Sequence, residues 1–150
     1  MRRLLLLLAT AVVAVSQIED PAYTQLEQAY AALRANNYDQ AVASFERAIA
    51  LAPDRSSIRK DLAYTLLKIG ENEAARDQFA EAMRLDPSDT HVALEYAFLC
   101  YETKQPVIAR RTFDHLRKSG DVTAAEAFEN IDRPLRERNC ALAAGPGALA

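Results

Sequence analysis

Apolar residues recur through most of this chain at spacings of three and four, the pattern that places them on one face of a helix. Short polar or glycine-containing stretches interrupt the pattern at Asn36-Asn37, Gly70 and Lys104-Gln105, and such stretches are typical of turns. The pattern therefore predicts six helices in succession, at residues 22–35, 38–51, 56–69, 72–84, 90–103 and 106–118.

A seventh helix is expected near residues 123–132, where Ala125, Phe128 and Ile131 form an apolar stripe. Pro134 is expected to end it, because a proline inside a helix removes one hydrogen bond and clashes with the preceding turn. The segment 122–143 is thus predicted to be a capping helix with a short extension. The final segment, 144–150, holds two of the four glycines and is expected to be a disordered tail.

The chain also matches itself when it is shifted by the interval that separates Phe45 from Phe79. Three columns of identical residues result: Ala29, Ala63 and Ala97; Ala41, Ala75 and Ala109; Phe45, Phe79 and Phe113. Small residues let helices cross closely, and each Phe fills the space between one repeat and the next, burying a side chain worth roughly 1.5–3 kcal/mol. The predicted repeats are 22–54, 55–89 and 90–121.

Two of these repeats carry a longer motif, which resembles the tetratricopeptide repeat. The motif runs Ala41-x3-Phe45-x2-Ala48-x4-Pro53 and again Ala75-x3-Phe79-x2-Ala82-x4-Pro87. The resemblance covers residues 22–121 and implies an all-α protein, a right-handed α-solenoid of helix–turn–helix units with a terminal capping helix. The sequence departs from the family where an aromatic residue is usual near the start of each first helix, since Gln25, Arg59 and Ala93 occupy those positions.

The first residues have the features of a secretory signal peptide. Arg2-Arg3 precede an apolar run from Leu4 to Val15, and Ser16 offers a small side chain for cleavage, so we expect a signal at 1–16. A helix of that run rises only about 18 Å, against about 30 Å of bilayer hydrocarbon. We therefore expect an exported protein, periplasmic or secreted, without a stable transmembrane anchor. A retained N-terminal anchor stays as the alternative.

Composition and charge narrow the possible chemistry. The formal net charge of −3 provides no basic field for nucleic acid. With two histidines and no nucleophile, phosphate-loop or metal-ligand motif, we expect no catalytic residue, no metal and no cofactor. Cys100 and Cys140 could form a disulfide, but we favour a small buried role for Cys100 because it lies in a strongly periodic helix.

The resemblance also implies a concave groove lined by the first helix of each repeat. Three columns of residues are expected to face it: Tyr30, Tyr64 and Phe98; Leu33, Leu67 and Tyr101; Glu27, Asp61 and Glu95. The first two columns would supply apolar contact area, and the third is acidic in every repeat. These columns predict a protein or peptide partner with apolar side chains and basic residues nearby. The alternative is that the rings only fill gaps between helices and that the carboxylates are merely solvated.

One binding mode of the family is excluded. Some tetratricopeptide domains clamp the carboxylate end of chaperone tails with Lys, Asn and Arg, whereas the matching positions here hold Leu26, Tyr30, Asp61, His91 and Glu95. Together with the signal-like first residues and the lack of catalytic motifs, the resemblance leads us to expect a scaffold or assembly factor that acts outside the cytoplasm and is not an enzyme. Two alternatives remain: a targeting or regulatory fragment of a larger envelope or secretion machine, and a helical enzyme with an unrecognised site.

Overall fold

The structure, a computed structural model, describes residues 20–143 and the side chains through residue 134. This part of the chain consists of helices and turns, with no strand. The helices are α1 (Tyr23–Arg34), α2 (Tyr38–Leu51), α3 (Ser56–Lys68), α4 (Asn72–Leu85), α5 (Thr90–Glu102), α6 (Pro106–Lys118) and α7 (Val122–Ala143). The six predicted helices are confirmed to within one residue at each end. The expected signal peptide at 1–16 and tail at 144–150 lie outside the described residues.

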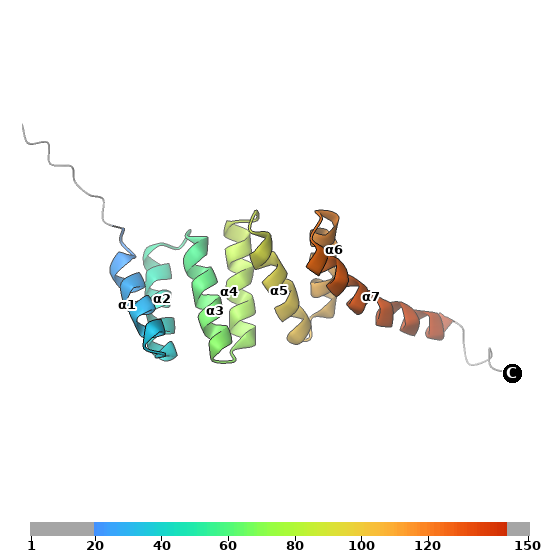
Figure 1. The fold of residues 1–150 in the computed structure, drawn as a ribbon, viewed down its shortest axis with the longest axis horizontal. Helices are drawn as coiled ribbons and strands as arrows, with labels where there is room; N and C mark the ends of the chain where they lie inside the picture. The colour runs from blue at the N-terminus through green and yellow to red at the C-terminus, as the bar shows by residue number, and fades with distance from the viewer. Residues whose placement is uncertain (1–19, 144–150) are drawn as a thin grey trace, which may run out of the picture.

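The helices stack in chain order into an elongated solenoid, as Figure 1 shows from α1 at one end to α7 at the other. Each helix packs mainly against the helices that precede and follow it in the chain. The pairs α1/α2, α3/α4 and α5/α6 are the three predicted helix–turn–helix units. Within residues 20–143, no helix combines the length and the apolar character that crossing a membrane requires.

The repeated columns form the centre of the stack. All nine residues of the three identical columns are completely buried, including Phe45, Phe79 and Phe113. The alanines allow the helices to approach one another, and each phenylalanine is enclosed in a core cluster that spans more than one repeat. The periodicity of the sequence therefore corresponds directly to the periodicity of the core.

The turns inside the repeats share one backbone geometry. Asn36, Gly70 and Lys104, which occupy the same position in successive repeats, have positive φ angles of 56°, 82° and 61°. In each turn the following backbone N–H reaches back to the last turn of the helix; the Gln105 N–H, for example, donates to the Cys100 carbonyl at 2.7 Å. This is the left-handed helix ending that glycine adopts most easily. A lysine in this conformation is strained, since its Cβ crowds the following carbonyl oxygen.

We expect Lys104→Gly to stabilise the protein by up to about 1 kcal/mol, because the strain of a left-handed lysine, about 1–2 kcal/mol, exceeds the entropy cost of glycine. The reverse change, Gly70→Ala, should destabilise through backbone strain alone, since an added Cβ would meet nothing within 4 Å. Denaturant unfolding measures both changes. Lys104→Ala is the control, because it removes the charge and keeps the strained backbone; a gain in stability with Lys104→Ala would contradict the explanation.

Helix α7 covers the end of the stack. Its inward face buries Ala124, Phe128 and Ile131 against α6, while Glu126 and Glu129 on its outward face are exposed. The capping helix was correctly expected, although the buried alanine is Ala124 rather than the half-buried Ala125. Asp121 caps the start of the helix by accepting a hydrogen bond from the Ala124 N–H at 2.8 Å.

The predicted break at Pro134 is wrong, because α7 continues through this residue to Ala143. Pro134 and Asn130, one turn earlier, are both exposed. On an exposed helix face, the carbonyl group that a proline leaves without its donor can be hydrated, so the helix can continue. The end of α7 projects past the stack (Figure 1).

Candidate partner-binding face

The aromatic column, Tyr30, Tyr64 and Phe98, lies along α1, α3 and α5. Each ring packs edge-on against the buried phenylalanine of its own repeat: Tyr30 on Phe45 at 5.5 Å between ring centroids, Tyr64 on Phe79 at 5.0 Å, and Phe98 on Phe113 at 5.0 Å. The outer parts of the rings remain accessible, since Tyr30 is 38% exposed and Phe98 39%. Each ring therefore fills a gap between helices and also presents apolar surface to solvent.

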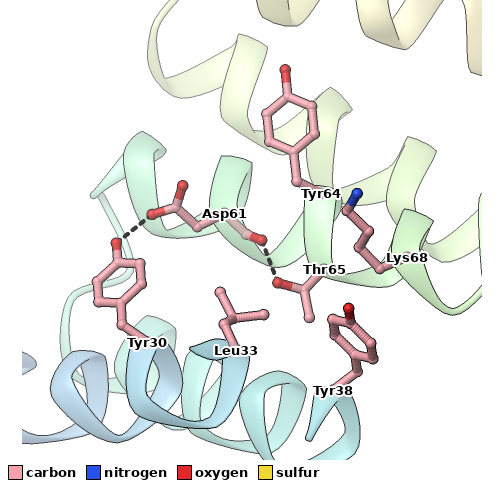
Figure 2. Close-up of a pocket in the computed structure, with 7 residues that line it drawn as sticks. All are labelled: Tyr30, Leu33, Tyr38, Asp61, Tyr64, Thr65 and Lys68. Carbon is pink, nitrogen blue, oxygen red and sulfur yellow. Dashed lines mark hydrogen bonds between the residues drawn. The ribbon is translucent and has the colours of Figure 1, made fainter. Parts of the chain in front are cut away.

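A hollow of about 300 Å³ lies between α1 and α3. Figure 2 shows the residues that line it: Tyr30, Leu33, Tyr38, Asp61, Tyr64, Thr65 and Lys68. The Tyr30 hydroxyl donates to Asp61 Oδ2 at 2.5 Å and so links α1 to α3. The Thr65 hydroxyl donates to the Asp61 carbonyl at 2.7 Å. These contacts leave an apolar hollow with a polar edge, which we call the first hollow.

A second hollow, of about 310 Å³, lies between α5 and α7. Its lining residues are Phe98, Tyr101, Phe113, Ala127, Asn130 and Ile131. Phe98 and Tyr101 stand two repeats along from Tyr30 and Leu33, so the two hollows occupy equivalent places in the stack. Tyr101 is 53% exposed and offers the largest free aromatic surface at this end of the groove. Leu67, from the same column as Leu33 and Tyr101, is half-buried and packs on the core between the hollows.

The acidic column is less uniform than its sequence suggests. Glu27 accepts a hydrogen bond from the Tyr23 hydroxyl at 2.7 Å, and Asp61 is held by Tyr30. Glu95 makes only a long contact, 3.9 Å, between its Oε1 and His91 Nε2. Glu95 is therefore the acid of this column with the weakest internal partner.

The tyrosine hydroxyls of the aromatic column remain protonated. Burial, together with the hydrogen bond to Asp61, raises the pKa of Tyr30 to about 12. Burial also raises the pKa of Tyr64, with the nearby Glu95 carboxylate adding to the effect. The Tyr64 hydroxyl lies 3.1 Å from His91 Nδ1 and links α3 to α5. Successive first helices are thus joined across the groove by side-chain contacts.

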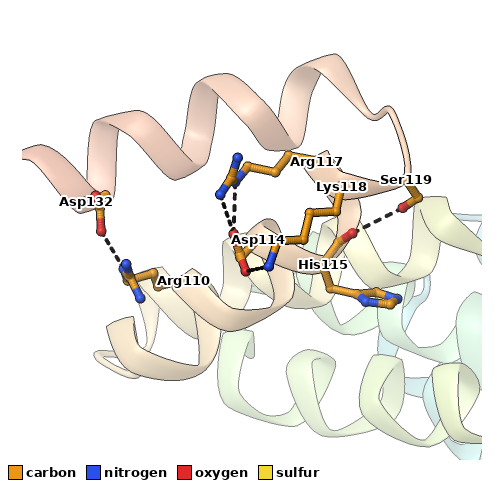
Figure 3. Close-up of polar contacts among 7 residues, drawn as sticks. All are labelled: Arg110, Asp114, His115, Arg117, Lys118, Ser119 and Asp132. Atoms are coloured by element: carbon orange, nitrogen blue, oxygen red, sulfur yellow. Dashed lines mark hydrogen bonds and ion pairs between the residues drawn. The ribbon is translucent and has the colours of Figure 1, made fainter.

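The sequence did not reveal the ion pair at the end of the aromatic column. One further repeat interval beyond Phe98 leads to Asp132, which is 2% exposed. Arg110 Nε donates to Asp132 Oδ1 at 2.6 Å, which joins α6 to α7 (Figure 3). The Arg117 guanidinium lies 4.2 Å from the centre of the Phe128 ring. The sequence did contain one signal for this ion pair: an acidic residue, Asp132, stands at a column position that is aromatic in the three preceding repeats.

The described residues were also considered for metal binding and for thiol chemistry. No group of His, Cys, Asp or Glu among the described residues could hold a metal ion. Cys100 is a free and completely buried thiol, as the favoured interpretation predicted, and its burial raises its pKa. The groove therefore presents apolar and hydrogen-bonding contacts, which suit a binding surface.

Comparison with known proteins agrees with the fold and the repeat pattern. The family model for the tetratricopeptide repeat matches residues 26–90, which contain the whole motif of the first repeat and of the second. This chain is a tetratricopeptide-repeat protein. Proteins of this fold are generally interaction modules without catalytic activity, so the chain is a protein–protein interaction module of this family.

Two relatives are similar in sequence to this tetratricopeptide-repeat chain. A TPR repeat-containing thioredoxin, TTL4, of Arabidopsis thaliana is 32% identical over 106 residues, which cover 69% of this chain. The type IV pilus assembly protein PilF of Pseudomonas aeruginosa is 31% identical over 91 residues, which cover 55% of this chain. The matched parts span only 15% of the thioredoxin and 36% of PilF.

A solved structure shows the same fold. The first TPR domain of Spaghetti (RPAP3), bound to the HSP90 peptide SRMEEVD, superimposes with a TM-score of 0.64 at 14% identity. The match covers 77% of this chain and 94% of that domain. At this identity the likeness establishes the all-α repeat fold and nothing about the ligand.

Proposed function

We propose that this tetratricopeptide-repeat protein is exported and acts outside the cytoplasm as a non-catalytic scaffold or assembly factor, binding a segment of a partner protein in its groove. The observation that carries the proposal is the aromatic column, because its rings are anchored on buried phenylalanines and still expose their outer parts. Rigid aromatic side chains provide contact area at a small entropy cost and are enriched at binding hot spots.

The similar proteins support this proposal by analogy. The RPAP3 domain is bound to a peptide, and PilF is an assembly protein. The peptide held by RPAP3 contains three acidic residues. The groove proposed here carries Asp61 and Glu95, which would repel such a peptide, so we expect a partner segment with apolar side chains and nearby Lys or Arg.

We expect Tyr64→Ala to weaken partner binding at least tenfold, because Tyr64 lies in the middle of the aromatic column, where water is best excluded. The partner would be captured from an envelope fraction with the mature protein, and its affinity for each purified variant would be measured. A melting curve for each variant separates lost binding from lost folding. Wild-type affinity in a folded Tyr64→Ala variant would contradict the groove as the binding surface.

Two milder changes serve as matched controls. Tyr64→Phe removes the hydroxyl that contacts His91 and keeps the ring, so it should retain most of the affinity. Asp61→Asn removes a charge with little change of volume. Contacts to exposed carboxylates should weaken as the Debye length shrinks from about 10 Å at 0.1 M salt to about 3 Å at 1 M, whereas the aromatic contacts should persist.

The proposed export leads to a separate prediction. The Leu4–Val15 run and the small Ser16 lead us to expect a mature protein that begins near Gln17. Fractionation of cells that express the full chain, followed by N-terminal sequencing, measures this directly. Protein that retains Met1 in the cytoplasmic fraction would rule out the proposed export and leave the groove proposal intact.

A further inference from the structure

Helices α4 and α6 occupy equivalent places in successive repeats, and each presents a stripe of residues to solvent on the side opposite its buried residues. The stripe residues recur at intervals of four, four and three, which places them along one line of the helix surface. On α4 they are Glu73, Asp77, Glu81 and Arg84, and on α6 they are Val107, Arg111, His115 and Lys118. We call these lines the acidic stripe and the basic stripe.

The charges of both stripes are accessible from solvent. The side chain of Asp77 is 65% exposed and that of Lys118 is 66% exposed, although each also contacts an oppositely charged side chain of its own helix. Glu73 and Arg111 are exposed and have no ion-pair partner among the described residues. Both stripes can therefore form ion pairs with another molecule without first breaking a buried contact.

The sign of the charge along this line changes from one repeat to the next. Asp77 and Arg111 stand at equivalent positions of α4 and α6, as do Glu81 and His115, while α2 has the uncharged Ala43 at the position of Asp77. The buried columns keep the same residue through all three repeats. The core therefore does not require the change of sign, which is confined to the solvent side of the helices.

A second copy of the chain has the charges that complement both stripes at once. A twofold axis that lies between two such faces and runs along the helices places α4 of each copy on α6 of the other. An axis that runs across the helices would instead place α4 on α4 and α6 on α6, where like charges repel. Charge complementarity therefore selects the first arrangement, in which an acidic stripe meets a basic stripe twice.

We propose that the protein forms a weak, salt-sensitive homodimer in which the acidic stripe of each copy packs against the basic stripe of the other. Val107, which is 62% exposed, adds apolar surface at the start of the basic stripe. Exposed ion pairs each contribute little, so we expect a dissociation constant between about 10 μM and 1 mM. The aromatic column lies on α1, α3 and α5, so the dimer contact does not use it.

Sedimentation velocity of the mature protein measures the association. At concentrations of about 20–500 μM and about 0.05 M salt, it should show a monomer–dimer equilibrium. Raising the salt to about 0.5 M should weaken the dimer at least tenfold, because exposed ion pairs are screened. A monomer at every concentration in low salt, or a dimer that ignores salt, would overturn the proposal.

Two charge-reversal variants test which faces meet. Glu73→Lys with Asp77→Arg makes the acidic stripe basic, and Arg111→Asp with His115→Glu makes the basic stripe acidic. Each variant alone should dimerise at least tenfold more weakly than wild type, because like charges then face one another at both contacts. An equimolar mixture of the two variants should form a heterodimer about as strong as the wild-type dimer, which also shows that both variants are folded. A mixture that stays monomeric contradicts the proposed pairing.

Two further variants serve as controls. Glu126→Lys with Glu129→Arg makes the same change of net charge as the α4 variant, but on the exposed face of α7, and should dimerise as wild type does. Equal weakening in this control would show a general effect of net charge and would overturn the proposal. Tyr64→Ala should also dimerise as wild type does. A weaker dimer in a folded Tyr64→Ala variant would assign the contact to the groove and equally rule out the paired stripes.

Discussion

Replacing Phe79 by alanine should lower the free energy of unfolding by about 3–5 kcal/mol, the range found when a buried phenylalanine is truncated. Phe79 is completely buried in α4, and Tyr64 packs on its ring at 5.0 Å. The loss combines the removed apolar contacts with the cavity left behind. Since single domains are stable by only about 5–15 kcal/mol, this change would remove a large share of the total. Denaturant unfolding followed by circular dichroism measures the effect.

The matched changes at Phe45 and Phe113 test the role of position. All three side chains are equally buried, but the repeat that contains Phe79 has a neighbouring repeat on each side. Phe79→Ala should therefore cost the most, because both neighbouring interfaces lose support. Val122→Ala, at a residue that is 72% exposed, should have almost no effect. A melt of Phe79→Ala that matched wild type would show that the repeat alignment is wrong.

Replacing Arg110 by methionine should loosen the docking of α7 on α6 by about 1.5–3 kcal/mol, the range for a hydrogen bond to a charged group, because the pair is buried only on the aspartate side. The Asp132 side chain is only 3% exposed, whereas that of Arg110 is 42% exposed. Loss of the arginine therefore deprives a buried carboxylate of its 2.6 Å ion pair. Hydrogen exchange of the α7 amides, measured beside denaturant unfolding, should show faster exchange in α7 than in wild type.

Two further variants show whether the charge is responsible. Arg111→Met makes the same substitution at the next, exposed position and should leave stability within about 0.5 kcal/mol of wild type. The double change Arg110→Met with Asp132→Leu replaces both charges by apolar groups, which is often nearly neutral. It should recover most of the lost stability. If the double variant were as unstable as Arg110→Met alone, packing rather than charge would explain the loss.

The sequence was sufficient to predict the helices and the core. The repeat period, together with Asn36, Gly70 and the prolines, marks helix ends through local backbone preferences that tertiary contacts here do not override. The buried Phe column follows from the same period. These features are local or strictly repeated, and for that reason they can be recognised in a single sequence.

The features that the sequence did not predict depend on which way a particular side chain points. Pro134 lies on the exposed side of α7, where a helix can continue through a proline, and no local signal distinguishes this case from a helix end. Likewise, the acidic column could be recognised, but the engagement of Asp61 by Tyr30 could not, since the two residues belong to different repeats. The ion pair of Asp132 with Arg110 joins two helices in the same way.

The burial of Cys100 lets this thiol report how often the third repeat opens. Its side chain has no exposed surface, and its raised pKa keeps the reactive thiolate scarce. A labelling reagent can reach the sulfur only while α5 and α6 are apart. In a Cys140→Ser background, the labelling rate relative to that of a free thiol therefore gives the fraction of molecules in which these helices have separated, before the chain unfolds as a whole.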